Sequence, residues 1–245
     1  MPALTAEAIT AGYSRVPIIR DVGLTAEAGT ITTIVGPNGA GKSTFAKALC
    51  GVLKPIAGRI WVGDTEITKL PGHLIPRNGL AYVPQNENVF ASMTVRENLE
   101  VAGYIRLGKS DAKIAEVLAV FPDLAVAEGK RAGQLSGGQQ NMLAMARSLM
   151  VDPKVIIFDE PTAGLSPAYT SIVWEQIERI ASTGTAAIVV EQNVDRALTH
   201  ADRVYVLVAG TNYVDGTSAE IGALDLGAIF LGHSKTESEN QQQAQ

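Results

Sequence analysis

The chain has 245 residues, of which 20 are Lys or Arg and 25 are Asp or Glu, so its formal net charge is −5 at pH 7. This length fits one α/β domain with a modest insertion, and the acidic balance provides no basic stripe for a nucleic-acid backbone. The single cysteine, Cys50, excludes an internal disulfide framework, and we expect it to be a small buried hydrophobe.

No segment approaches about 20 uninterrupted apolar residues, and the first residues lack a basic region followed by an apolar core. We therefore expect a chain that neither spans a membrane nor carries a secretion signal. Any membrane association would come through partner proteins.

Residues 3 to about 35 have the pattern of strands, with turns at Gly12 and Gly29. The last of these strands, the apolar run 31–35, leads into the sequence Gly-Pro-Asn-Gly-Ala-Gly-Lys-Ser at 36–43, and a helix is predicted to follow. The order strand, glycine loop, helix is the context that a phosphate-binding loop requires.

In such a loop, glycines let backbone N–H groups turn toward phosphate oxygens at a helix N-terminus. Lys42 would reach the β- and γ-phosphates, and the Ser43 hydroxyl would ligate Mg²⁺. The alternative is an ordinary glycine turn before a helix. The residues expected to bind nucleotide in this loop are Gly36, Asn38, Gly39, Gly41, Lys42, Ser43 and Thr44.

Strands are predicted at 59–62 and 80–84, and the pattern becomes helical between Gln85 and Leu135. One predicted helical face carries Val95, Leu99 and Ala102, and another carries Ile114, Val117, Leu118 and Phe121. We expect these apolar positions to form core rather than an exposed docking surface.

Residues 135–139 read Leu-Ser-Gly-Gly-Gln and precede a helix predicted over 140–150. A Ser and a Gly-Gly pair at a helix start can present a hydroxyl and N–H groups to an anion. A Ser-capped helix after a flexible turn is the alternative interpretation.

The next apolar run, 155–158, is typical of a central parallel strand and ends at Asp159 and Glu160. Ligands of open α/β sheets bind at the carboxyl ends of strands. Asp159 is therefore a candidate for the magnesium shell, directly or through water, and Glu160 for the general base that orients and deprotonates a water. Two solvated acids at a strand end would be the alternative.

The remaining pattern predicts a helix over 166–182, strands at 185–190 and 204–208, and short helices near 218–231. The residues from 233 to 245 are polar, without apolar periodicity, and are predicted to be disordered.

The stretch 135–139, in order with the glycine loop and the acids at 159–160, resembles the signature of ATP-binding cassette (ABC) ATPases. The resemblance implies an α/β P-loop fold: a mixed sheet flanked by helices, an N-terminal antiparallel β subdomain and an inserted helical subdomain. It implies a cassette over 3–232, with the core at 3–85 and 140–232 and the helical subdomain at about 86–139, and it implies ATP and Mg²⁺ as ligands.

Smaller elements of the pattern also match this family. Tyr13 resembles the aromatic residue that stacks on adenine, although a half-buried tyrosine of an N-terminal strand is the alternative. Gln85 resembles the glutamine that touches magnesium or water and couples to the membrane subunit. Residues 164–166 resemble the family's D-loop, and Ser166-Pro167 also has the pattern of an N-cap with proline at N1.

One position departs from the commonest family pattern, because Gln192 stands where a switch histidine is expected. Its amide can still donate a hydrogen bond to a γ-phosphate, but it cannot gain a proton near neutral pH. We therefore count Gln192 among the catalytic residues with Glu160 and Lys42, and expect turnover not to depend on protonation at residue 192. A weakened site is the alternative.

The resemblance further implies two cassettes packed head to tail, so that Ser136, Gly137, Gly138 and Gln139 of one complete the nucleotide site of the other. The second cassette could be the same chain or a companion. Integral membrane permease subunits and, indirectly, a solute-binding protein are the other implied partners. The implied location is peripheral, on the cytoplasmic face of the inner membrane.

Glu191-Gln192-Asn193, the run 159–167 and the ending 228–232 are similar to LivF-type ATP-binding subunits of branched-chain amino-acid transporters. Very similar subunits serve urea and short-chain amide uptake. Two further classes stay open: an ABC regulator without a transport role, and another P-loop enzyme such as a kinase, which would transfer phosphoryl to an acceptor other than water.

Overall fold

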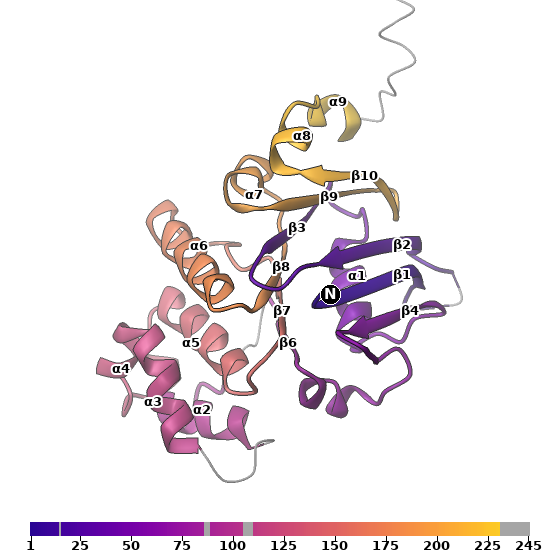
Figure 1. Cartoon of the computed structure of the whole chain (residues 1–245). Helices are drawn as coiled ribbons and strands as arrows, with labels where there is room; N and C mark the ends of the chain where they lie inside the picture. Colours follow the sequence, from indigo (N-terminus) through magenta and orange to yellow (C-terminus); the bar gives the residue numbers. More distant parts are fainter. Residues whose placement is uncertain (15, 86–88, 105–109, 231–245) are drawn as a thin grey trace, which may run out of the picture.

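The computed structural model of the chain describes residues 1–14, 16–85, 89–104 and 110–230. Two sheets lie on opposite sides of the first helix, α1 (Lys42–Leu49) (Figure 1). The smaller sheet is antiparallel and has the strand order β2-β1-β4-β5. Its strands are β1 (Leu4–Ala11), β2 (Ile19–Ala26), β4 (Ala57–Val62) and β5 (Thr65–Glu66).

The larger sheet has six strands in the order β10-β9-β3-β8-β7-β6 and is mixed. Strands β9, β3, β8, β7 and β6 run parallel, and β10 closes one edge antiparallel to β9. The strands are β3 (Ile31–Val35), β6 (Leu80–Val83), β7 (Val155–Asp159), β8 (Ala186–Val190), β9 (Arg203–Val208) and β10 (Thr211–Thr217). The two sheets confirm the expected α/β architecture with an N-terminal antiparallel unit.

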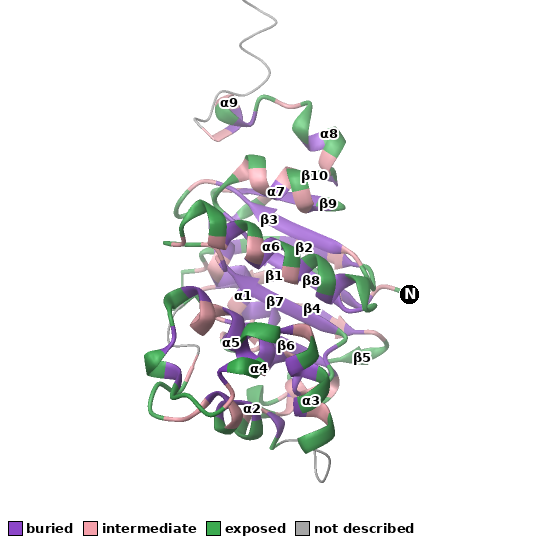
Figure 2. Ribbon diagram, turned by 90° about the vertical axis from the view of Figure 1, so that its left-hand side faces the viewer, coloured by how far each residue is buried: buried purple, intermediate pink, exposed green. Residues whose placement is uncertain are grey.

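Both faces of the large sheet are covered, which explains why its central strands are continuous apolar runs. All five residues of β7 and of β8 are buried. Val155 and Ile157 pack with α1 and the small sheet, whereas Ile156 and Phe158 pack with the helices on the other face. Figure 2 shows this buried band, with exposed helix surfaces outside it.

The helical unit lies between β6 and β7 in the sequence, and the predicted apolar faces turn inward. Val95 and Leu99 of the first predicted face are fully buried, whereas Ala102 is only partly buried, and the second predicted face is buried as well. None of the described helices is long and apolar enough to cross a bilayer. The face of the large sheet opposite α1 carries the helices α2 (Val95–Gly103), α3 (Ser110–Val120), α4 (Pro122–Val126), α5 (Gly137–Leu149) and, after β7, α6 (Pro167–Ser182).

The other helical segments are short. The 3₁₀ turns are η1 (Gly72–Leu74), η2 (Pro76–Asn78) and η3 (Ala132–Gln134), and the helices are α7 (Val194–His200), α8 (Ser218–Gly222) and α9 (Leu226–Phe230). The two last helices confirm the prediction near 218–231 over the residues that are described. The polar tail from residue 233 lies outside the described residues.

The helix predicted to begin at Gln140 begins three residues earlier, at Gly137. Ser136 is its N-cap: the Ser136 hydroxyl accepts from the backbone N–H of Gln139, and the Gln139 side chain accepts from the backbone N–H of Ser136. This reciprocal capping box satisfies two backbone donors at the helix start and outweighs the low helix propensity of the two glycines.

The two glycines at the start of α5 have different surroundings. Gly138 is buried, and a Cβ at this position would lie 2.2 Å from the Cδ1 and Cε1 atoms of Tyr169 on α6. Gly137 is exposed, and a Cβ there would meet no atom within 4 Å. Gly138 therefore permits the close approach of α5 and α6, whereas Gly137 faces open space in the single chain.

We expect Gly138→Ala to lower the free energy of unfolding by about 1–3 kcal/mol, because the added methyl group overlaps the Tyr169 ring. Gly137→Ala, the matched control, should stay within about 0.5 kcal/mol of the wild type. Denaturant titration checks both values. In a Tyr169→Ala background the cost of Gly138→Ala should shrink, and an undiminished cost there would contradict the packing argument.

Candidate nucleotide site

The candidate site lies at one edge of the large sheet. Strands β3, β6, β7 and β8 are parallel, so their carboxyl ends meet at the same edge. The glycine loop, Gln85 and Gln192 follow β3, β6 and β8, and Asp159 ends β7, with Glu160 directly after it. The fold thus gathers groups from four separate parts of the sequence.

The glycine loop and the start of α1 line a hollow of about 280 Å³, which also includes Glu160. Gly41 is the N-cap of α1 with a left-handed φ of 96°, and a Cβ there would lie 2.5 Å from Cγ2 of Ile19. Gly39 also has a positive φ but faces open space, which leaves room for a ligand. The lining residues are Ile18, Asn38, Gly39, Gly41, Lys42, Ser43, Thr44 and Glu160.

Lys42 is buried, and its ammonium group points back to the loop. Its Nζ donates to the carbonyl oxygens of Gly36, at 2.8 Å, and Pro37, at 3.2 Å. Burial lowers the pKa of Lys42, while the negative charges of Glu160 and Asp159 act to raise it. An anion in the hollow would therefore stabilise the charged form of this side chain.

Asp159, at the end of β7, is 5% exposed and has only one of its carboxylate oxygens in use. Its Oδ2 accepts from the Tyr82 hydroxyl at 2.9 Å, whereas Oδ1 is buried without a hydrogen-bond partner among the described residues. The pKa of the Tyr82 phenol is raised mainly by burial, and further by the charge of Asp159 and the hydrogen bond to it. The phenol therefore remains a hydrogen-bond donor.

The free Oδ1 atom of Asp159 suits a divalent cation with oxygen ligands. Within the described residues no group of three or more His, Cys, Asp or Glu side chains could hold a metal. A single available carboxylate oxygen, Oδ1 of Asp159, fits Mg²⁺ better than a transition metal, because Mg²⁺ is commonly bound by one or two carboxylates together with substrate phosphates and water.

Glu160 is held by two glutamines from different loops. Gln85 Nε2 donates to Glu160 Oε2 at 3.0 Å, and Gln192 Nε2 donates to Glu160 Oε1 at 2.8 Å. Glu160 also has a φ of 50°, a left-handed backbone conformation that is uncommon for residues other than glycine. The structure thus places the Glu160 carboxylate between the amide of Gln192, which was expected to be catalytic, and the amide of Gln85, which was expected near magnesium or water.

Tyr13 lies beyond the end of β1, and 62% of it is exposed. The alternative of a half-buried tyrosine within a strand is therefore wrong. The Lys47 ammonium lies 5.8 Å from the centre of the Tyr13 ring and donates to its hydroxyl at 3.4 Å. An exposed ring backed by a cation from α1 is available to stack on a base.

The segment at 135–139 is not part of the Lys42 hollow, whose lining includes none of its five residues. Ser136 and Gly137 are exposed at the N-terminus of α5, and the Ser136 oxygen accepts from the Gln139 backbone. The hydroxyl hydrogen of Ser136 can still donate, for instance to a phosphate oxygen. Within one chain, however, the two candidate phosphate-binding elements remain apart.

Sequence reasoning assigned no role to three residues that the structure places at this centre: Tyr82, Thr162 and Glu191. Glu191 is only 3% exposed, and its carboxylate accepts from the Thr162 hydroxyl at 2.5 Å. A polar residue directly after an all-apolar strand was the available signal for Glu191. Nothing in the local sequence indicates the pairing of Tyr82 with Asp159, because 77 positions separate them.

Comparisons with known proteins agree with this geometry. Residues 19–163 match the family model described as ABC transporter. A probable branched-chain amino acid transport ATP-binding protein, LivF, from Archaeoglobus fulgidus is 41% identical over 216 residues, which cover 87% of this chain and 91% of that protein. The high-affinity branched-chain amino acid transport ATP-binding protein BraG from Pseudomonas aeruginosa is 38% identical, with 89% and 94% covered.

Among solved structures, the ADP conformation of MJ1267, an ATP-binding cassette of an ABC transporter, superposes with a TM-score of 0.81. It is 27% identical, and the match covers 94% of this chain and 95% of that one. These findings confirm the resemblance drawn from the glycine loop, the acids at 159–160 and the stretch 135–139. The chain belongs to the ABC transporter family and is a nucleotide-binding ATPase subunit of that family.

Proposed function

We propose that this ATPase powers the uptake of branched-chain amino acids through separate permease subunits. The observation that carries the hydrolytic part is the hollow that combines Lys42 and the glycine loop with Glu160. The cargo assignment is supported by the printed names of the two relatives, which are 38–41% identical over most of the chain. A urea or short-chain amide importer and an ABC regulator without transport are the competing functions.

In the proposed reaction, backbone N–H groups of the loop and Lys42 bind the phosphates of ATP and stabilise the charge that develops during phosphoryl transfer. Glu160 orients the attacking water and accepts its proton. Gln192 would move its amide from the Glu160 carboxylate to the γ-phosphate, and Tyr13 would stack on the adenine. Positioning, rather than covalent catalysis, accounts for the rate enhancement.

We also propose that Mg²⁺ binds with the nucleotide, held by the Ser43 hydroxyl and Asp159, with Gln85 nearby. The unpartnered Oδ1 of Asp159 supports this assignment. Bound Mg²⁺ would neutralise phosphate charge. Tyr82 fixes the other carboxylate oxygen, so that Oδ1 keeps one orientation.

A second cassette, either a copy of this chain or a companion, would complete the site in a head-to-tail dimer. Ser136, Gly137, Gly138 and Gln139 of each chain would face the nucleotide of the other. The exposed Ser136 and Gly137, which lie outside the Lys42 hollow of their own chain, support this arrangement. The proposed core consists of residues 3–85 and 140–232, and the proposed helical subdomain of about 86–139. The boundary between residues 139 and 140 lies within α5.

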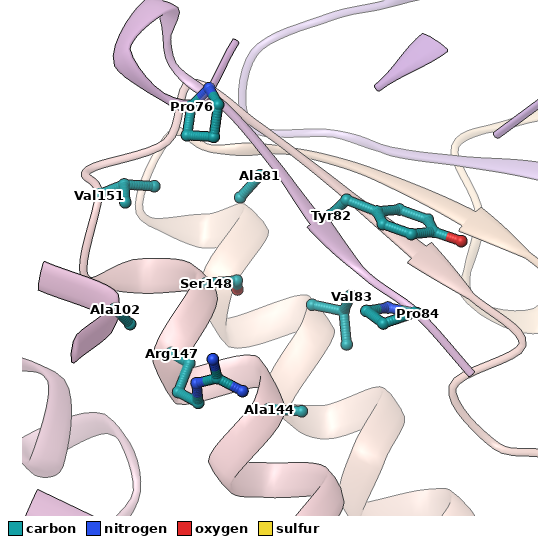
Figure 3. A pocket seen from close by; sticks show the side chains of 10 residues that line it. All are labelled: Pro76, Ala81, Tyr82, Val83, Pro84, Ala102, Ala144, Arg147, Ser148 and Val151. Carbon is teal, nitrogen blue, oxygen red and sulfur yellow. The ribbon is translucent and has the colours of Figure 1, made fainter. Parts of the chain in front are cut away.

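The proposed permease contact lies near Gln85, beside a hollow of about 330 Å³ between β6, α2 and α5. In Figure 3, Val83 points toward Ala144 and Arg147, whereas the Tyr82 ring projects to the opposite side of β6, toward the catalytic edge. One strand thus borders both the hollow and the Asp159 carboxylate. The proposed location is peripheral, on the cytoplasmic face of the inner membrane, with a solute-binding protein acting through the permeases.

Glu160→Gln is expected to bind ATP and accumulate an ATP-bound dimer, with turnover reduced about 100-fold or more, because the amide cannot accept the proton from water. Phosphate release and size-exclusion chromatography measure the two effects. Glu175→Gln, an exposed change on α6, is the matched control and should leave turnover unchanged. Undiminished hydrolysis in Glu160→Gln would remove this residue from the catalytic role.

Gln192→Ala should lower kcat about tenfold, because it deletes the amide donor that now contacts Glu160. Gln192→His restores an N–H donor and should recover most of the rate, with little change in the pH profile between pH 7 and 8.5. Steady-state phosphate release over this range provides the comparison. Full activity of Gln192→Ala would count against any role of this side chain.

The cargo can be tested on the complex purified with its permeases and reconstituted in proteoliposomes. Leucine, isoleucine or valine, presented with the solute-binding protein of the complex, should raise ATP turnover several-fold. Urea and acetamide are the competing ligands in the same assay. Stimulation by these two but not by the branched amino acids would replace the proposed cargo, and a chain that co-purifies with no membrane subunit would favour the regulator.

A further inference from the structure

Glu191 is a buried carboxylate that none of the proposed catalytic steps uses. It lies directly after β8, and its carboxylate joins two loops at the catalytic edge. The Oε1 atom accepts from the Thr162 hydroxyl at 2.5 Å, and Oε2 accepts from the backbone N–H of Gln192 at 3.1 Å. Thr162 belongs to the loop that starts at Glu160, so the two bonds span both catalytic loops.

The position is costly for an acid. Burial raises the pKa of Glu191, and the negative charge of Glu160 acts in the same direction. The hydroxyl of Thr162 and the backbone N–H groups of Gln192 and Asn193 act in the opposite direction by donating hydrogen bonds. An apolar residue after β8 would avoid this desolvation cost. We therefore attribute the acid at this position to the hydrogen bonds that its carboxylate oxygens accept.

These contacts close a ring of interactions around the hydrolytic centre. The backbone N–H of Glu160 donates to the carbonyl of Val190 at 3.0 Å, which joins the ends of β7 and β8. The side-chain amide of Gln192 reaches the Glu160 carboxylate at 2.8 Å. The bond from Glu191 to Thr162 adds a third link, between the loop that carries the base and the loop that carries the amide.

We propose that Glu191 is a positioning residue for ATP hydrolysis, which fixes the separation of Glu160 and Gln192 by tying Thr162 to the Gln192 backbone. This inference rests on the proposed roles of Glu160 and Gln192. It assigns Glu191 no contact with the nucleotide. A displacement of about 1 Å at reacting groups can cost about 100-fold in rate, so a missing tie should reduce kcat rather than ATP affinity.

The test measures kcat and KM for ATP in variants of the full chain. Thr162→Val and Glu191→Leu each remove the tie and should each lower kcat about tenfold, with KM changed less than about twofold. The double variant should lose no more than Glu191→Leu alone, because Glu191→Leu already deletes the hydrogen bond that Thr162→Val removes. Thr162→Ser and Glu191→Gln, which can keep a hydrogen bond between the loops, should retain kcat within about threefold of the wild type.

Thr185→Val is the matched control. Thr185 precedes the other end of β8, is also buried, and donates to the Pro153 carbonyl instead. It should leave kcat unchanged. If Glu191→Leu fails to fold, Thr162→Val still tests the tie, because it deletes one hydroxyl from a partly exposed loop residue.

Losses that multiply in the double variant, an unchanged kcat in Thr162→Val, or a KM that rises in step with the loss of kcat would each overturn the proposal. The failure of the proposed function is a separate result, since it would be seen as undiminished hydrolysis in Glu160→Gln. If Glu160→Gln loses hydrolysis but Thr162→Val keeps the wild-type kcat, the positioning role of Glu191 is refuted and the role of Glu160 is not.

Discussion

The carboxylate of Glu160 lies between two amide donors from different loops, and the geometry of the whole centre depends on its position. Gln85 and Gln192 each donate to one of its oxygens at the edge of the sheet, and its negative charge acts to raise the pKa of Lys42 in the same hollow. The same carboxylate lines the hollow of the glycine loop and a second hollow bordered by Thr162 and Gln192. Glu160 therefore adjoins both the glycine loop and the loops that carry Thr162 and Gln192, and in the proposed mechanism its position links phosphate binding to water activation.

This position follows from the sheet. Strands buried on both faces leave side chains little freedom, and their fixed register places the residues that follow β7 and β8 next to each other. The left-handed φ of Glu160 and the buried acid side chain of Glu191 are local costs in a fold that is otherwise consistent. Costs of this kind concentrate at functional sites, where the surrounding packing can support them.

Much of this could be predicted from the sequence, because the relevant signals are local. The glycine loop lies between an apolar strand and a helix, and Asp159 and Glu160 end an apolar run, so their meeting at one edge follows from parallel pairing. The start of α5 was predicted three residues late, although Ser136 and Gln139 have the spacing of a capping box. Helix α7 and strand β10 were not predicted, since α7 is short and β10 is an exposed edge strand.

The long-range pairs could not be predicted. Tyr82 with Asp159 and Thr162 with Glu191 are 77 and 29 positions apart, and no local pattern indicates which hydroxyl meets which acid. In the proposed dimer, each chain also needs its partner to complete the site, because Ser136 lies outside the hollow that contains Lys42 of the same chain. Local patterns therefore predict the residue types of the centre, whereas the hydrogen bonds that hold its acids in place are seen only in the three-dimensional structure.

The role of Glu160 can be tested in a crystal structure of the wild-type chain with Mg²⁺ and a non-hydrolysable ATP analogue. The decisive quantity is the distance between the Glu160 carboxylate and the γ-phosphorus atom. We expect Gln192 to leave the carboxylate for the γ-phosphate, and one water molecule to bridge Glu160 and the phosphorus over about 5–6 Å. A Glu160 carboxylate that remains bonded to both glutamines, with no water between it and the phosphate, would contradict the account.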